Sequence, residues 1–206
     1  MLPAFYPILD VDVARARLLD PLAVLDGWLD AGVRLVQLRA KALAGAAFLE
    51  LANRCAQRAA SAGATFIVND RADVALLSRA GGVHLGQEDL PPVAARRVVP
   101  SPTLIGWSTH NEAQVQAASS MPIDYLAIGP VFGTTSKERP DAVVGIEGVR
   151  MAVRLAAGRP VVAIGGITID TASEVLRAGA SSIAVISDVM HADAATRARE
   201  FLQVTG

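Results

Sequence analysis

Residues that form covalent cross-links or metal clusters are scarce in this chain. Its 206 residues include one cysteine, Cys55, and three histidines. A single cysteine excludes an internal disulfide framework and any metal site built from several cysteines. Because Cys55 has apolar neighbours within a helical pattern, we expect its thiol to be buried in the core.

An excess of charge of either sign is also absent. The formal net charge is −1 and the sequence pI is about 6.3, so we expect neither a nucleic-acid nor an anionic-membrane partner. No apolar run approaches the roughly 18 residues of a transmembrane helix, and no basic segment followed by an apolar stretch opens the chain. A cytoplasmic protein is therefore expected, and its oligomeric state, a homo-oligomer included, stays open.

The chain does contain enough apolar sequence for one packed core. Hydrophobic residues make up 52% and charged residues 19%, which excludes intrinsic disorder. No Pro/Ser-rich or low-complexity stretch divides the sequence, and about 100–200 residues is the usual size of a domain. We therefore expect a single domain over residues 1–206.

Short runs rich in Val, Ile and Leu alternate with longer segments of helical spacing from end to end. The expected strands are Phe5–Leu9, Arg34–Arg39, Thr65–Asn69, Gly82–Leu85, Thr103–Trp107, Tyr125–Gly129, Pro160–Ile164 and Ser182–Ile186. The expected helices are Pro21–Ala31, Gly45–Ala62, Arg71–Ala80, Pro91–Val98, Glu112–Ser120, Ile146–Ala157, Asp170–Ala178 and Ala194–Val204. Near-continuous apolar strands are typical of a parallel sheet covered on both faces. Eight strand–helix units predict an α/β fold, a single (β/α)8 TIM barrel, since an open doubly wound sheet usually has about five or six strands.

The connections show two further patterns. Glycine follows four expected helices, at Gly32, Gly63, Gly81 and Gly179, where we expect the left-handed backbone that ends many helices. The connection after the sixth strand, Pro130–Gly145, is unusually long. Long loops in compact domains are usually functional or disordered, so we expect this one to cover a polar ligand.

Polar residues gather where strands end, which is where the active site of a (β/α)8 barrel lies. The second strand ends in Gln37, Arg39 and Lys41, whose spacing of two predicts that all three side chains face the barrel mouth. Two cations and an amide in this arrangement suit a phosphate or a diphosphate. The alternative is a solvated strand end.

Two carboxylates follow the next two strands. Asp70 follows the third strand and Asp89 follows the fourth, so we expect them at neighbouring points of one rim. Mg²⁺ binds through one or two carboxylates plus phosphate oxygens, which makes this pair a candidate metal site beside the diphosphate. The alternative for each residue is an N-cap of the helix that follows.

Hydroxyl groups and glycines follow later strands. The fifth strand ends in Ser108-Thr109-His110, where the hydroxyls also resemble helix caps, and we do not expect His110 to be catalytic. Thr134-Thr135-Ser136-Lys137 suits a lid over a phosphate, with a merely flexible loop as the alternative. Gly165-Gly166 lets a phosphate approach the backbone, with a tight structural turn as the alternative. Two phosphate pockets at one mouth predict displacement of diphosphate by a second, phosphorylated substrate.

In order and spacing, these segments resemble the thiamine phosphate synthase family over essentially the whole chain. The matching segments are Gln37-Leu38-Arg39-Ala40-Lys41, Val68-Asn69-Asp70-Arg71-Ala72-Asp73, Gly82-Val83-His84-Leu85-Gly86-Gln87-Glu88-Asp89-Leu90-Pro91, Gly106-Trp107-Ser108-Thr109-His110, Ile128-Gly129-Pro130-Val131-Phe132, Thr134-Thr135-Ser136-Lys137 and Ala163-Ile164-Gly165-Gly166-Ile167. The resemblance implies a (β/α)8 barrel that joins a hydroxymethylpyrimidine diphosphate to a thiazole phosphate, giving thiamine phosphate and diphosphate.

The resemblance also implies roles for individual residues. Asp70 and Asp89 would hold Mg²⁺, and Ser108 would lie beside the pyrimidine amine. The residues that would bind the pyrimidine diphosphate are Gln37, Arg39, Lys41, Asn69, Thr134, Ser136 and Lys137. The residues that would hold the thiazole phosphate are Gly166, Ile186 and Ser187. Among these, the catalytic residues would be Arg39, Ser108 and Lys137.

Three positions depart from the usual pattern of the family. Gly133 stands in place of a proline and Ser136 in place of a threonine, which should loosen the lid but keep its hydroxyls. Asp188 stands where a small residue is common, and its charge, if turned inward, would oppose phosphate binding.

Two alternative functions remain open at this point. One is a thiazole tautomerase of the same superfamily, which typically lacks the paired metal carboxylates. The other is a non-catalytic barrel that binds a thiamine precursor and regulates.

Overall fold

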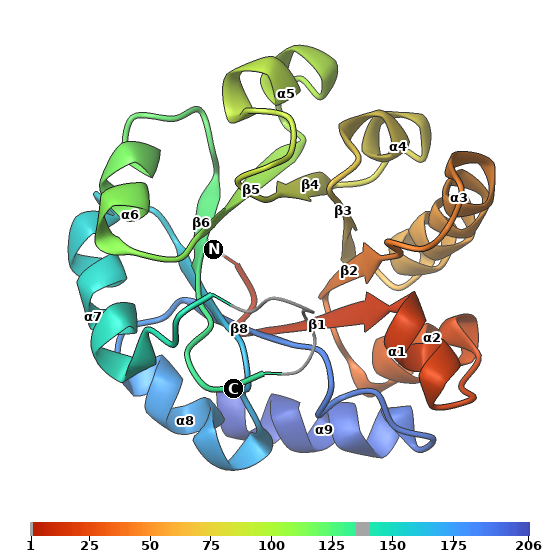
Figure 1. Ribbon diagram of the computed structural model, residues 1–206. Coiled ribbons are helices and arrows are strands. Elements are labelled where there is room, and N and C mark those ends of the chain that lie inside the picture. Colours follow the sequence, from red (N-terminus) through yellow and green to blue (C-terminus); the bar gives the residue numbers. More distant parts are fainter. Residues whose placement is uncertain (1, 135–140) are drawn as a thin grey trace.

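The computed structural model describes residues 2–134 and 141–206 and contains eight parallel strands. These are β1 (Phe5–Asp10), β2 (Leu35–Arg39), β3 (Thr65–Asn69), β4 (Gly82–Leu85), β5 (Leu104–Thr109), β6 (Tyr125–Ile128), β7 (Val161–Ile164) and β8 (Ser182–Val185). The strands pair in sequence order, and β1 pairs with both β2 and β8, so the sheet is a closed barrel (Figure 1). The predicted (β/α)8 barrel is confirmed.

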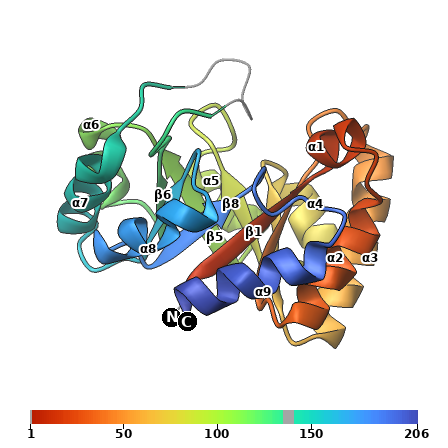
Figure 2. The same cartoon turned by 90° about the horizontal axis from the view of Figure 1, so that it is seen from below.

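Helices surround the strands on the outside of the barrel (Figure 1). In the described part of the chain they are α1 (Val11–Ala16), α2 (Pro21–Ala31), α3 (Gly45–Ser61), α4 (Ala72–Leu77), α5 (Pro92–Val98), α6 (Glu112–Ala118), α7 (Gly145–Leu155), α8 (Ile169–Arg177) and α9 (Ala194–Thr205). Figure 2 shows α9 lying across the outside of the barrel, where it packs against α2 and α8. None of the helices described is long and apolar enough to cross a membrane.

Helix α1 corrects the sequence-based prediction, in which the first strand ends at Leu9 and the first helix begins at Pro21. The helix has six residues, too few to give a clear apolar periodicity. It forms because the side chain of Asp10 accepts hydrogen bonds from the backbone N–H groups of Asp12 and Val13. These bonds satisfy donors that the first turn of any helix leaves without a partner.

The glycine pattern at the helix ends is correct at three of its four positions. The residues with a left-handed backbone as expected are Gly32 (φ 107°), Gly63 (φ 66°) and Gly179 (φ 105°). The expectation of a left-handed backbone at Gly81 is wrong, because the left-handed residue after α4 is Arg79, with φ 55°. Gly81 is needed for close packing instead, because a Cβ there would lie 2.9 Å from Cγ2 of Thr65.

The apolar residues form two cores, one on each side of the barrel wall. The buried residues of the inner core are Tyr6, Ile8, Leu35, Ile67, Tyr125, Ala127, Val162 and Ala184. The larger outer core lies between strands and helices and contains Cys55, which is fully buried as expected. Burial raises the pKa of the Cys55 thiol to about 12, so the group stays protonated and unreactive at neutral pH.

Helix α9 closes the ring by packing an aromatic side chain onto the first strand. The rings of Phe201 and Phe5 are stacked, with centroids 4.8 Å apart, and Phe201 is fully buried.

We expect Phe201→Ala to lower the free energy of unfolding by about 3–5 kcal/mol, because it leaves a cavity between α9 and β1. Urea denaturation measures this loss. Val204→Ala on the same helix, at a side chain 38% exposed, should cost less than about 1 kcal/mol, and equal losses would contradict the prediction.

Candidate active site

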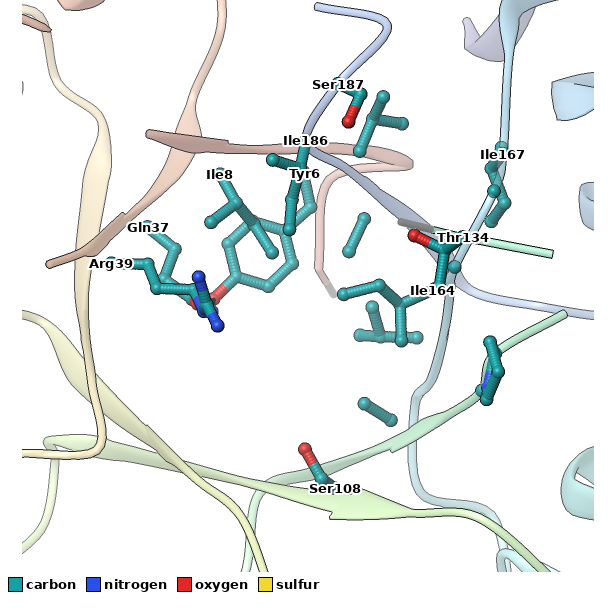
Figure 3. Close-up of a pocket in the computed structure, with 18 of the residues that line it drawn as sticks. Tyr6, Ile8, Gln37, Arg39, Ser108, Thr134, Ile164, Ile167, Ile186 and Ser187 are labelled. Atoms are coloured by element: carbon teal, nitrogen blue, oxygen red, sulfur yellow. Dashed lines mark hydrogen bonds between the residues drawn. The ribbon is translucent and has the colours of Figure 1, made fainter. Parts of the chain in front are cut away.

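A cavity of about 620 Å³ opens at the carboxyl ends of the strands. The sequence-predicted residues that line it are Gln37, Arg39, Asn69, Ser108, Thr134, Gly166, Ile186 and Ser187. Figure 3 shows Arg39 and Gln37 on one wall, Thr134 on the opposite wall, and the Ser108 hydroxyl pointing into the space between. This volume lies in the usual range for sites that enclose a small molecule, about 300–1,000 Å³.

Strand β2 supplies the polar groups of one wall. Gln37 is 2% exposed, and its Nε2 donates a hydrogen bond of 2.8 Å to the hydroxyl of Tyr6. Arg39 forms an ion pair with the buried carboxylate of Asp10 on β1. The strand ends at Arg39, so the alternation that turns these two side chains inward does not continue to Lys41.

Lys41 lies in an adjoining pocket of about 180 Å³, which it shares with Asn69 and Asp70. Its ammonium nitrogen is 3.4 Å from Oδ2 of Asp70. The Asp70 carboxyl also lies within hydrogen-bonding reach of the Asp89 carboxyl. The two carboxylates expected to be neighbours on the rim are therefore neighbours, with a cation beside them.

The surroundings of Asp70 disfavour its charged form. Burial raises the pKa of the Asp70 carboxyl, the nearby Asp89 raises it further, and Lys41 lowers it. The backbone of Asp70 is left-handed, with φ 65°, a conformation that costs free energy for a residue with a side chain. Like charges and strain held together in this way are typical of functional sites.

The alternative for these two carboxylates, helix capping, does not apply. Neither α4 nor α5 has a side-chain hydrogen bond at its N-cap. Asp89 instead accepts a hydrogen bond of 2.7 Å from the backbone N–H of Gly86, which fixes one of its oxygens. In the ranges that the structure describes, no group of three or more His, Cys, Asp or Glu side chains could hold a metal ion. A metal bound by two carboxylates needs further oxygen ligands, which a diphosphate can provide.

A chain of hydrogen bonds crosses the interior of the barrel. The Tyr6 hydroxyl, which accepts from Gln37, lies 3.1 Å from the Tyr125 hydroxyl. Tyr125 lies 3.1 Å from Nδ1 of His84, whose Nε2 lies 2.9 Å from the Ser108 hydroxyl. Burial raises the pKa of both tyrosines, so their hydroxyls stay protonated at neutral pH. The chain links two residues expected to touch the pyrimidine, Gln37 and Ser108.

The middle members of this series of hydrogen bonds were not expected from the sequence. Tyr6, His84 and Tyr125 lie within strands, where they look like ordinary core residues. One signal was available, because Gly106 interrupts the apolar strand β5 and an isolated strand glycine marks a close approach. A Cβ on Gly106 would lie 2.1 Å from Cζ of Tyr125 and 2.4 Å from Nδ1 of His84.

On the opposite side of the mouth, Gly165 and Gly166 both have a left-handed backbone, with φ 103° and 64°. A Cβ on Gly166 would lie 2.4 Å from the carbonyl oxygen of Gly133, and Phe132 donates its N–H to the Gly165 carbonyl at 2.9 Å. The glycine pair is therefore a tight structural turn against the loop after β6. Because Gly166 also lines the cavity, this turn leaves backbone accessible to a ligand.

Asp188, next to Ser187, lines the cavity with its charge already paired. Its Oδ1 lies 2.6 Å from the guanidinium of Arg197, and its Oδ2 accepts the backbone N–H of Ile169 at 2.8 Å. Asp188 is the first cause of the raised pKa of Arg197, followed by Glu200. Arg197 thus offsets the negative charge that would otherwise oppose a phosphate here.

Some expected site residues cannot be compared with the structure, because Thr135, Ser136 and Lys137 lie outside the described residues. His110 lines the cavity, and its Nδ1 is 2.7 Å from the carbonyl oxygen of Gly129.

These features define a class of protein. A (β/α)8 barrel with cations and paired carboxylates on one side of its mouth, and accessible glycine backbone on the other, has the features of an enzyme that acts on phosphorylated small molecules.

Comparisons with known proteins identify the family. The family described as thiamine monophosphate synthase matches residues 5–189. A thiamine-phosphate synthase of Koribacter versatilis is 44% identical, over 98% of this chain and 96% of its own, and one of Chloroflexus aurantiacus is 40% identical, over 96% and 90%. The solved structure of a thiamine phosphate pyrophosphorylase from Pyrococcus furiosus, 35% identical, superposes with a TM-score of 0.87 over 98% of this chain and 94% of its own. The chain belongs to the thiamine monophosphate synthase family, whose members of that name are transferases of thiamine biosynthesis.

The buried chain of hydrogen bonds yields a prediction about stability. Tyr125→Phe removes the one hydroxyl that lies between Tyr6 and His84, in a side chain 1% exposed. We expect it to lower the free energy of unfolding by about 1–3 kcal/mol, because buried polar partners are left without a bond. Urea denaturation with an unchanged slope measures this, and a loss below about 0.5 kcal/mol would contradict it.

The raised pKa of Asp70 yields a second prediction. Asp70→Asn should raise the melting temperature of the metal-free protein at pH 7, because it removes a charge that burial and Asp89 disfavour. In the unsubstituted protein the unfolded state loses the Asp70 proton first, so stability falls as pH rises from 3.8 to the raised pKa. The gain in Asp70→Asn should therefore grow over this window. Melting curves between pH 4 and pH 8 measure it.

Asp73 provides a control of opposite sign. Hydrogen bonds from Arg71 lower the pKa of its carboxyl, so Asp73→Asn should lower the melting temperature at pH 7. The effect should be small, because the Asp73 side chain is 56% exposed. If Asp70→Asn lowered the melting temperature as Asp73→Asn does, the conclusion that the charge of Asp70 is unfavourable would be wrong.

Proposed function

We propose that this chain catalyses the thiamine phosphate synthase reaction, in which hydroxymethylpyrimidine is transferred from its diphosphate to a thiazole phosphate. One observation carries this proposal beyond family membership: the Asp70 carboxyl lies beside that of Asp89, with Lys41 at 3.4 Å, in the pocket that shares Asn69 with the cavity lined by Arg39. The carboxylates would bind a divalent cation, and this cation together with Lys41 and Arg39 would balance the negative charge of a diphosphate.

The residues present fit Mg²⁺ as the cofactor. Asp70 and Asp89 offer the oxygen ligands that this ion prefers, and their mutual repulsion is the kind that a bound cation relieves. When bound there, Mg²⁺ supplies positive charge that offsets the charge developing on the departing diphosphate.

The chain's own cations act on the same leaving group. Arg39 presents a fixed guanidinium fork to the phosphate oxygens, and Lys41 adds a second charge from the adjoining pocket. Lys137, Ser136 and Thr134, from the connection after β6, would close over the diphosphate from the other side, with Arg39 and Lys137 as the catalytic cations. Charge stabilisation of this kind lowers the barrier to leaving-group departure without a protein nucleophile.

The pyrimidine is held by residues at the two ends of the buried hydrogen-bond chain. Ser108 lies beside the exocyclic amine as the third catalytic residue, Gln37 binds the ring, and Asn69 faces both pockets. Because His84 contacts the Ser108 hydroxyl at 2.9 Å, that hydroxyl is restrained before the substrate arrives. The electron-rich aminopyrimidine can then support positive charge at its methylene carbon, which the thiazole nitrogen attacks.

The second substrate occupies the glycine-lined side. Backbone N–H groups near Gly166, Ile186 and Ser187 would hold its phosphate, as loops after the last two strands of such barrels often do. Apolar side chains such as Ile8 and Ile164 also line the cavity. They would pack on the flat rings and keep water from the reacting carbon, so that positioning contributes much of the rate.

The test is an assay of the purified protein with both substrates. We expect thiamine phosphate and diphosphate in equal amounts, with turnover that stops when a chelator removes Mg²⁺. Asp70→Asn should reduce kcat by about 100-fold or more, whereas the neighbouring Asp73→Asn should stay within about twofold. Absence of thiamine phosphate with folded protein would refute the proposed function. Full activity in Asp70→Asn would refute the metal site alone.

A further inference from the structure

Asp10 is a buried carboxylate to which neither the sequence pattern nor the proposed mechanism assigns a role. It ends β1 and is 1% exposed. Its Oδ1 accepts hydrogen bonds from the backbone N–H groups of Asp12 and Val13, each 3.0 Å long, at the start of α1. Its Oδ2 forms the ion pair with Nη1 of Arg39. One oxygen therefore fixes the carboxylate to the backbone, and the other is free to fix a second side chain.

Arg39 is the side chain that receives this constraint. Asp10 and Arg39 are register partners on adjacent parallel strands, so both leave the sheet at the same height. The Arg39 side chain is 15% exposed and borders the cavity, where Figure 3 shows it on the same wall as Gln37. A guanidinium has five N–H donors in a rigid fork, so the bond at Nη1 orients the donors that remain.

We propose that Asp10 is a positioning residue, which holds the Arg39 guanidinium in the orientation that binds the diphosphate leaving group. This inference rests on the proposed function, since it concerns the group that Arg39 contacts there. A long arginine side chain without a partner samples many rotamers, and catalysis is sensitive to misplacement of about 1 Å. The backbone at the start of α1 holds the Asp10 carboxylate, and the carboxylate in turn holds the Arg39 guanidinium.

Simple electrostatics predicts the opposite effect. A carboxylate behind Arg39 repels a diphosphate, so removing its charge should strengthen binding if Asp10 did nothing else. A second competing role, capping of α1, needs only an acceptor oxygen. Asp10→Asn separates these roles, because an asparagine side chain can still accept the backbone bonds but does not form the ion pair.

We expect Asp10→Asn to lower kcat by about tenfold or more, with a melting temperature within a few degrees of the unsubstituted protein. Asp12→Asn is the matched control, since it removes the same charge two residues further on and leaves the Arg39 ion pair in place. It should stay within about twofold. In an Arg39→Lys background, Asp10→Asn should lower kcat by less than about threefold, because the geometry it supports is already lost.

A readout that needs no turnover completes the test. In ¹⁵N NMR spectra of the full chain, the Arg39 guanidinium, assigned through Arg39→Lys, should show restricted rotation that Asp10→Asn abolishes. If the unsubstituted protein makes no thiamine phosphate, the proposed function fails, and this signal still decides the positioning role. An unchanged kcat in Asp10→Asn, an equal loss in the Arg39→Lys background, or a persisting restricted signal would each overturn the inference.

Discussion

Closure of the parallel barrel is the constraint on which the site depends. Because every strand runs in the same direction and β1 pairs with β8, the carboxyl ends of all eight strands meet at one rim. Residues as far apart in sequence as Arg39 and Ser187 therefore line one cavity. The rim also brings like charges together: burial raises the pKa of the Asp70 carboxyl, and the neighbouring Asp89 raises it further. The fold tolerates this arrangement because the cores on either side of the wall supply its stability.

Much of the fold was predictable from local pattern, since eight apolar runs and the helices between them are each visible in short windows. The predictions that failed concern features set by hydrogen bonds or by contacts between distant segments. Helix α1 is made by two hydrogen bonds to Asp10 rather than by periodicity, and Arg79 takes the left-handed turn that a glycine was expected to take. A glycine is required at position 81 because Thr65, at the start of β3, lies so near, and no local window contains this contact.

The placement of Arg39, Asp70 and Asp89 at the rim was predictable from position alone, because polar residues after apolar strands are conspicuous; their roles stay predictions. A contact with a partner across the barrel was not predictable in this way. His84 and Tyr125 acquire their roles only from each other and from Ser108, at distances that closure sets. The sequence raised a concern about the charge of Asp188, and the structure answers it with Arg197, a residue nine positions along the chain.

Gly106 has a consequence for how this barrel can change over evolution. The volume that a side chain at this position would fill is already taken by the Tyr125 ring and the His84 imidazole. A larger residue at position 106 and these two rings thus exclude each other. A descendant barrel can enlarge position 106 only if smaller side chains replace the rings at positions 84 and 125, so the three positions are coupled.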